Sequence, residues 1–304
     1  MIDNLASGKL YLVGTPIGNV EDITLRAIRI LQEVDLIAAE DTRHTGKLLQ
    51  HLQINTPQIS YHEHNQATRI PELLARLQEG KVIAVVSDAG MPSISDPGYQ
   101  LVKAAVELGI EVIPIPGVTA AITALTGSGL ATARFVFEGF LPNKNKDRTT
   151  RLDEIRIESR TMIFYEAPHR LLQTLKDLEQ VLGSERQIVL ARELTKLYEE
   201  FWRGTIAGAI ALYTEVREGS SPPSKGGARE PRQPKGEYTL VVAGKSVATS
   251  VTLSETELKN QLAQLLQQGM SKSQASRHLA SLTTQSRQEI YQIAIAMNER
   301  NSKG

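Results

Sequence analysis

The chain has 304 residues, 34 basic and 34 acidic side chains, and no cysteine. Its length predicts two domains or slightly more, and its 41% hydrophobic and 22% charged residues are typical of a globular protein. The absence of cysteine excludes disulfides, thiolate metal ligands and a cysteine nucleophile. No apolar run reaches the ~18–20 residues that span a bilayer, and the N-terminus lacks the basic and apolar segments of a signal peptide. We therefore expect a cytoplasmic protein without membrane contact, and a net charge of 0 gives no sign of a nucleic-acid partner.

The first half of the chain alternates short apolar runs with amphipathic segments. Strands are predicted at residues 10–13, 36–39, 81–86 and 111–115, and helices at 22–34, 71–78 and 99–108. Residues 81–86 are rich in β-branched side chains, as in a strand buried on both faces. Strands that alternate with helices form a largely parallel sheet, so the predicted fold class is α/β.

A second α/β block is predicted after a polar, basic stretch at residues 141–151, which is typical of an interdomain linker. Its strands are predicted at 161–165, 187–191 and 238–243, and its helices at 170–182 and 206–216. Residues 217–236 are rich in Gly, Ser and Pro, which predicts a mobile insertion. The predicted α/β domains are residues 1–140 and 141–246.

The tail, residues 252–304, has the periodicity of three short helices. Leu258, Leu262, Leu265 and Leu266 form one apolar face, and Ser271 can cap the next helix. We predict a small helical domain of helix-turn-helix type, with a helical cap on the enzyme as the alternative.

Two glycine-containing segments follow predicted strands and would leave backbone uncovered. In "VGTPIGN", Gly14 and Gly18 allow a close approach, although the segment is neither a dinucleotide fingerprint nor a P-loop. In "SDAGMPSISDPG", Asp88 directly follows a strand, and Ala89-Gly90 exposes backbone groups. Together with "PGVTAA" at 116–121, these segments predict a ligand site at the carboxyl edge of the sheet, or close helix packing as the alternative.

Charged residues also gather at predicted strand ends. Asp41 or Thr42 in "AAEDTRHTGKLL" could cap a helix or belong to a site, and "SYHEHN" has two histidines without a third metal ligand, so no metal is expected. The segments "FYEAPHR" and "ARELTKLYEE" place further carboxylates and cations after two strands of the second half. This pattern indicates a cleft between the domains that suits a charged substrate.

In this order, "GTPIGN", "AEDTRHT", "SDAGMPSISDPG", "PGVTAA", "FEGFLP", "FYEAPHR", "ARELTKLYEE" and "GEYTLVVAG" resemble the tetrapyrrole methylase superfamily over residues 9–244. Within it, they resemble the branch that methylates the 2′-hydroxyl of a cytidine in 16S ribosomal RNA. The resemblance implies a two-domain class III methyltransferase fold, a homodimer, and S-adenosylmethionine in the cleft between the domains. By motif match, the implied cofactor contacts are Pro16, Asp88, Ala89, Gly90, Met91, Thr119, Ala120, Glu166, Leu194 and Gly236.

Methylation of a ribose hydroxyl is helped by a group that accepts its proton. The candidates, which the sequence does not rank, are Glu166, Glu40, Asp41, His62 and Lys196. Candidate contacts to the phosphates of 16S ribosomal RNA in the small subunit are Arg43, Arg170, Arg192, Lys144, Lys146 and Arg148. The last three could equally be a solvated linker. The alternative functions are methylation of a small tetrapyrrole-like substrate and a non-catalytic RNA-binding assembly factor.

Overall fold

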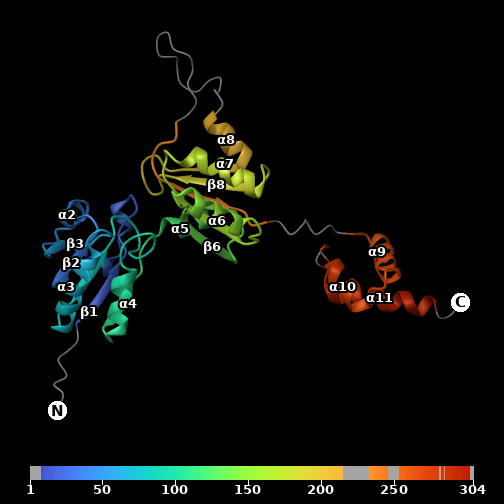
Figure 1. Ribbon diagram of the computed structural model, residues 1–304, viewed down its shortest axis with the longest axis horizontal. Coiled ribbons are helices and arrows are strands. Elements are labelled where there is room, and N and C mark those ends of the chain that lie inside the picture. The colour runs from blue at the N-terminus through green and yellow to red at the C-terminus, as the bar shows by residue number, and fades with distance from the viewer. Residues whose placement is uncertain (1–7, 215–232, 246–252, 281, 284, 302–304) are drawn as a thin grey trace, which may run out of the picture. The chain divides into compact units, whose positions relative to one another are not determined.

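A computed structural model describes residues 8–214, 233–245, 253–280, 282–283 and 285–301, with side chains up to residue 297 (Figure 1). The chain divides into two compact units, Met1–Ala243 and Gly244–Gly304. The predicted insertion at 217–236 lies outside the described residues except for its last four positions.

The first sheet has the strand order β3-β2-β4-β1-β5, and all its pairs are parallel, as predicted. The strands are β1 (Lys9–Val13), β2 (Leu36–Ala39), β3 (Gln58–Ser60), β4 (Ile83–Val86) and β5 (Glu111–Ile115). The intervening helices are α1 (Leu25–Glu33), α2 (Thr42–His51), α3 (Gln66–Gln78) and α4 (Tyr99–Glu107). Side chains of β4 alternate between two apolar clusters, one packed with α1 and the other with α3 and α4. The central strand is therefore buried on both faces, which explains its continuous apolar run.

The second sheet has the order β6-β7-β10-β8-β9 and is mixed, because only β6 and β7 pair in parallel. Its strands are β6 (Phe135–Phe140), β7 (Thr161–Glu166), β8 (Gln187–Arg192), β9 (Glu200–Thr205) and β10 (Tyr238–Val242). Helices α7 (Leu171–Leu182) and α8 (Ile206–Thr214) pack on one face. Helix α5 (Ala120–Ser128), which directly follows the first sheet, packs on the other face together with Ile17. Ile17, in the loop after β1, and α5 thus pack on the second sheet.

The predicted linker at 141–151 is wrong, because most of it forms helix α6 (Asn145–Ile155). Only Leu152 and Ile155 of this helix are buried, so its sequence shows little apolar periodicity. Arg148 anchors the helix instead, through an ion pair with Asp177 (Nε–Oδ2 2.7 Å). Strand β6 precedes the predicted boundary at residue 140 but pairs with the second sheet. The domain boundaries themselves stay a prediction.

The second unit contains α9 (Glu255–Gln267), α10 (Lys272–Ala280) and α11 (Arg287–Asn301), where the three helices were predicted. The predicted apolar positions form its core, which includes Leu258, Leu262 and Leu279. Ser271 accepts a hydrogen bond from the Gln274 N–H (3.3 Å), so it caps α10 as predicted. Among the described residues, no helix is both long and apolar enough to cross a membrane.

Candidate functional site

The loops after β1 and β4 are joined by their backbones at the carboxyl edge of the first sheet. The Thr15 N–H donates to the Gly90 carbonyl (2.9 Å), and the Gly90 N–H donates to the Thr15 carbonyl (3.0 Å). The Thr15 hydroxyl also donates to the Ser87 carbonyl (3.1 Å). These bonds fix the relative position of two loops that were predicted to bind the same ligand.

Glycine allows a second close approach at this edge, between the loops after β1 and β5. A Cβ at Gly14 would lie 2.9 Å from the Gly117 Cα and 2.7 Å from the Met91 Sδ. Real Cβ atoms do not come this close to backbone, so position 14 requires glycine. Gly90 has φ +82°, and its neighbour Ala89 is exposed. The turn therefore presents backbone at Ala89, whereas Gly90 is buried and its N–H and carbonyl are bonded to Thr15.

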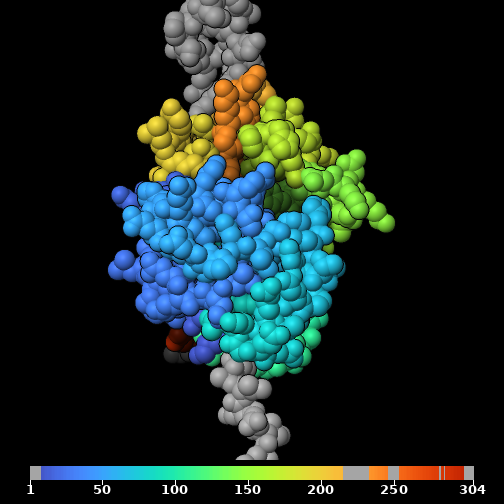
Figure 2. All heavy atoms as spheres, turned by 90° about the vertical axis from the view of Figure 1, so that its left-hand side faces the viewer, coloured from blue at the N-terminus to red at the C-terminus, as the bar shows by residue number. Residues whose placement is uncertain are grey.

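A cleft of about 470 Å³ opens beside this edge, and Figure 2 shows a hollow between the blue and the yellow-green halves of the first unit. The predicted cofactor residues Pro16, Asp88 and Ala89 line the cleft, together with Lys196 and Glu237 from the second half. Its volume and bare backbone suit a nucleoside-sized cofactor. The fit agrees with the predicted ligand, and the contacts of individual residues stay predictions.

Two carboxylates brace the loops at the cleft. The Asp88 N–H donates to Glu40 Oε2 (3.2 Å), and the Asp41 N–H donates to Asp88 Oδ1 (3.1 Å). Burial raises the pKa of Glu40 above its usual range, and the nearby charge of Asp88 adds to this effect. Burial likewise raises the pKa of Asp96 to about 7, with a further contribution from the charge of Glu40. No arginine or lysine of the described residues forms an ion pair with Glu40, Asp88 or Asp96.

Asp41 has a structural position at the start of α2. Its Oδ1 accepts the Arg43 N–H (2.8 Å), which makes Asp41 the N-cap, and its Oδ2 pairs with Arg43 Nη2 (2.6 Å). Hydrogen bonds from the Arg43 side chain hold the pKa of Asp41 far below its usual range. A carboxylate of such low basicity is a poor proton acceptor.

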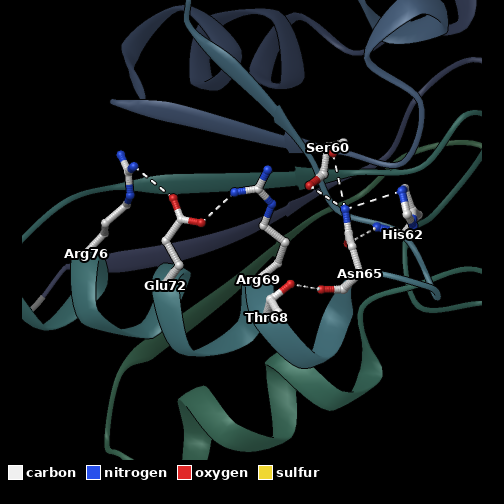
Figure 3. A network of polar contacts seen from close by, with 7 residues as sticks. All are labelled: Ser60, His62, Asn65, Thr68, Arg69, Glu72 and Arg76. Carbon is white, nitrogen blue, oxygen red and sulfur yellow. Dashed lines mark hydrogen bonds and ion pairs between the residues drawn. The ribbon is translucent and has the colours of Figure 1, made fainter.

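His62 lies in the loop after β3, within the polar network of Figure 3. Its N–H donates to Asn65 Oδ1 (2.9 Å), and the Asn65 amide nitrogen lies 3.3 Å from His62 Nε2. The buried Nδ1 has no hydrogen-bond partner in the described part of the chain. The network continues along α3 through Arg69, Glu72 and Arg76. The described residues contain no group of three His, Asp or Glu side chains that could hold a metal ion.

Glu166 lies away from the cleft, although its sequence position predicted both cofactor contact and proton transfer. Side chains of β7 alternate, so that Tyr165 faces α5 whereas Phe164 and Glu166 face α7. The fully buried Glu166 carboxylate accepts the Thr174 hydroxyl (2.5 Å) and pairs with Arg170 (Nε–Oε1 3.4 Å). The structure therefore turns Glu166 and Arg170 toward the core.

Lys196 lies at the cleft, but its charge is neutralised. Burial alone would lower the pKa of Lys196, yet hydrogen bonds to Glu237 (2.8 Å) and Glu193 (3.0 Å) outweigh it and raise that pKa. A lysine that stays protonated cannot accept a proton. Gly236 packs against the ion pair of Lys196 and Glu193, since a Cβ at Gly236 would lie 2.5 Å from the Glu193 side chain. Leu194 is buried in the cluster that faces α5.

The six predicted RNA contacts differ in availability. Arg148 and Arg170 are largely buried and hydrogen-bonded, and the Arg192 Nε donates to the Lys235 carbonyl (2.7 Å). Arg43, Lys144 and Lys146 are exposed.

Asp96, Phe140 and Tyr165 lie in the motifs "SDAGMPSISDPG", "FEGFLP" and "FYEAPHR", but they were not among the predicted site residues. The Tyr165 hydroxyl accepts the Ala121 N–H (3.2 Å) and so links the sheet to α5. The aromatic alternation in "FVFEGF" and "MIFYE" could have pointed to this cluster.

A parallel sheet and a mixed sheet that meet at such a cleft define a class of methylases. The family model described as Tetrapyrrole (Corrin/Porphyrin) Methylases matches residues 9–210. The chain belongs to this family, which confirms the predicted fold class.

Curated relatives narrow the class. The chain is 56% identical to ribosomal RNA small subunit methyltransferase I of Synechocystis sp. over 290 residues, which cover 95% of this chain and 98% of the relative. It is 51% identical over 239 residues to the protein of the same name from Escherichia coli O157:H7, 79% of each chain. Together with the family, these relatives confirm a methyltransferase.

Solved structures share the fold. Uroporphyrin III C-methyltransferase from Thermus thermophilus, in complex with S-adenosylhomocysteine, matches with a TM-score of 0.51 and 20% identity, over 78% of this chain and 97% of that one. Diphthine synthase matches with a TM-score of 0.57 and 13% identity, over 83% and 94%. The family uses S-adenosylmethionine, which confirms the predicted cofactor.

Proposed function

We propose that the chain transfers a methyl group from S-adenosylmethionine to the 2′-hydroxyl of a cytidine in the decoding region of 16S ribosomal RNA. Family membership and relatives named ribosomal RNA small subunit methyltransferase I support the reaction and the RNA. The observation that carries the proposal is the cleft, with the exposed Ala89 in its wall and the adjacent Gly90 fixed to Thr15.

The cofactor would be held mainly by the first sheet's edge. Pro16, Asp88 and Ala89 line the cleft, and the other proposed contacts are Gly90 and Met91 in the loop after β4 and Thr119 and Ala120 at the start of α5. From the second half, Leu194 and Gly236 are the remaining proposed contacts. The cofactor supplies a methyl group on a positively charged sulfur, and the chain's main task is to hold that carbon in line with the ribose oxygen.

Exposed cations support an RNA substrate rather than a small tetrapyrrole. Lys144, Lys146 and Arg43 offer phosphate contacts, and we propose that the C-terminal unit adds to them. We also propose that the protein acts in the cytoplasm as a homodimer.

Methyl transfer to RNA gives the direct test. Incubation with tritium-labelled S-adenosylmethionine and undermethylated small ribosomal subunits should label the 16S RNA, whereas free RNA and tetrapyrrole precursors should take up little. Absence of label in the subunit's RNA would overturn the proposal. Calorimetry should show saturable binding of S-adenosylmethionine that is lost in Asp88→Arg; absence of binding to the unaltered chain would favour a non-catalytic RNA-binding factor.

Removal of residues 253–304 tests the helical unit. Because this unit has its own core, its removal should leave the affinity of the first unit for S-adenosylmethionine unchanged. If it binds RNA as we propose, its removal should weaken methylation of the small ribosomal subunit. If cofactor affinity falls instead, the unit is a structural cap.

A further inference from the structure

Helix α2 turns one face toward the sheet and another toward the cleft. Thr45 and Leu49 are buried, and Leu49 packs with α1 in the apolar cluster on that side of the sheet. The residues of α2 that line the cleft recur at the spacing i, i+3, i+4 and i+7, namely His44, Lys47, Leu48 and His51. Such spacing places side chains on one face of a helix. The cleft face of α2 is therefore a stripe of two imidazoles and one ammonium around a single leucine.

A direct hydrogen bond fixes α2 beside the proposed cofactor wall. The N–H of Asp41, the N-cap of the helix, donates to Asp88 Oδ1 (3.1 Å), and Asp88 lines the same cleft. The Thr45 N–H donates to the Asp41 carbonyl (2.9 Å) and so closes the first turn. His44 is therefore held near the loop after β4, and His51 lies about 10 Å further along the helix axis.

The cleft face of α2 offers hydrogen-bond donors without a matching acid. The ten residues of the helix include no aspartate or glutamate. Lys47 is exposed and forms no ion pair among the described residues, whereas Lys196, the other lysine that lines the cleft, is bound to Glu193 and Glu237. A lysine ammonium has three donors, and an imidazole ring keeps an N–H donor whether it is charged or neutral. Of the two lysines at the cleft, Lys47 is thus the one whose charge is left for a ligand.

A strand with several phosphates fits this stripe better than a single small anion. The donors are spread over about 10 Å along the helix, which is more than one phosphate group covers. Lysine and other N–H donors are the usual partners of nucleic-acid phosphates. The opposite wall, where Glu237 already pairs with Lys196, offers phosphate little net attraction.

We propose that His44, Lys47 and His51 of α2 hold the phosphates of the RNA strand next to the target nucleotide, so that the strand enters the cleft along this helix. The inference rests on the proposed function and deepens it, since it names the wall to which the RNA binds. Arg43, already a proposed phosphate contact, lies on the same helix. Because phosphate contacts carry no sequence information, α2 supplies affinity and position, and the cytidine is recognised elsewhere.

The first test is Lys47→Ala, assayed on undermethylated small subunits. KM for the subunit should rise about 5-fold with kcat unchanged, and the slope of log Kd for the subunit against log salt should decrease by about 1. Lys47→Arg keeps the charge and should restore both values. Lys103→Ala removes an exposed lysine from α4, on the other face of the same sheet, and should change neither. If Lys47→Ala keeps the KM and the salt slope of the unaltered chain, the phosphate contact is wrong.

Calorimetry with S-adenosylmethionine separates a phosphate contact from a cofactor contact, because the cofactor carries a carboxylate that cations could also bind. The Kd should be unchanged in Lys47→Ala and in the double variant His44→Ala, His51→Ala, whose side chains are exposed. The double variant should raise the KM for the subunit about 5-fold. A 10-fold rise of the Kd for S-adenosylmethionine in either variant, about the effect of one lost hydrogen bond to a charged group, would assign the stripe to the cofactor and overturn the inference.

The absence of cysteine allows a probe to be placed on this face alone. Because the chain has no cysteine, Lys47→Cys supplies a single thiol that can carry an iron chelate producing hydroxyl radicals. Bound to the small subunit, this chelate should cleave 16S RNA within a few nucleotides of the methylated one, whereas the same chelate on Lys103→Cys should not. Equal cleavage from both positions, or none from Lys47→Cys, would overturn the placement of the strand.

The two proposals fail differently. If the unaltered chain labels no 16S RNA, the proposed function is wrong. If it labels 16S RNA and Lys47→Ala has an unaltered KM and salt slope, only this inference is wrong.

Discussion

Carboxylates follow strands of both sheets, but among the described residues of the first sheet only Asp41 is paired with a cation, Arg43. Glu166, Glu193 and Glu200 pair with Arg170, Lys196 and Arg192. Glu40, Asp88 and Asp96 of the first sheet have no such ion pair among the described residues. Grouped carboxylates without cations destabilise a fold and are typical of functional sites, whereas neutralised ones serve the structure. Charge at a strand end is therefore informative only once its partners are known.

The largest effect is expected where the carboxylate is neutralised. Glu166→Ala would leave Arg170 without its partner and Thr174 without an acceptor, so the free energy of unfolding should fall by about 3 kcal/mol. Trp202, the only tryptophan, packs on the core of the second sheet, so its fluorescence during urea unfolding reports this loss. Glu154→Gln, an exposed partner of Arg151, should change stability by less than ~0.5 kcal/mol. Equal stability of the two variants would contradict the structural role of Glu166.

A smaller effect is expected at Asp88, where the loss should appear in binding. Asp88→Ala removes the acceptor of the Asp41 N–H and one wall of the cleft. The Kd for S-adenosylmethionine should rise about 30-fold, as for the loss of a hydrogen bond to a charged group. Calorimetry measures it, with Asp35→Ala as the control at the far edge. An unchanged Kd would place the cofactor elsewhere.

Asp96 should affect stability in a direction set by pH. Its pKa is about 7 in the folded chain against 3.8 as its ordinary value, so the folded state binds more protons between these values. Its contribution to stability therefore falls as pH rises from about 4 to about 7. Asp96→Asn should be more stable than the unaltered chain at pH 8, by on the order of 2 kcal/mol, and equal to it near pH 4. Thermal melts at both pH values check this. If the variant is less stable than the unaltered chain at pH 8, the charged Asp96 side chain does not destabilise the fold.

The smallest effect is expected at Arg43, whose side chain is 87% exposed. Arg43→Ala should change stability by less than ~0.5 kcal/mol, because an exposed ion pair contributes little. If Arg43 binds phosphate, the slope of log Kd for RNA against log salt should decrease by about 1. Filter binding at several salt concentrations measures the slope, and Arg29→Ala, in an exposed pair on α1, is the control.

Hydrophobic pattern was sufficient for most of the fold. Four strands of the first sheet and the tail helices follow it closely, because each buries an apolar run or stripe. The short strand β3, which has no buried position, was not predicted. Helix α6 and strand β9 were missed for the opposite reason. Ion pairs and one apolar edge hold α6, and β9 begins with Glu200 and contains Arg203. Local pattern does not reveal elements that tertiary contacts stabilise.

The site residues also divide into those that a local sequence pattern could indicate and those that it could not. Pro16, Asp88 and Ala89 line the cleft and could be singled out from the sequence, since a turn after a strand is a local feature. Glu166 could not be assigned, because a shift of one residue along β7 moves a side chain to the other face of the sheet. Asp96 was not a predicted site residue, because its raised pKa depends on burial and on the charge of Glu40, which lies far from it in the sequence.

The reciprocal hydrogen bonds of Thr15 and Gly90 use backbone atoms, so their geometry is independent of most neighbouring side chains. Beyond Met91, the loop can then change its composition without moving the wall that faces the cofactor. The wall that faces the cleft therefore tolerates substitutions in the rest of the loop.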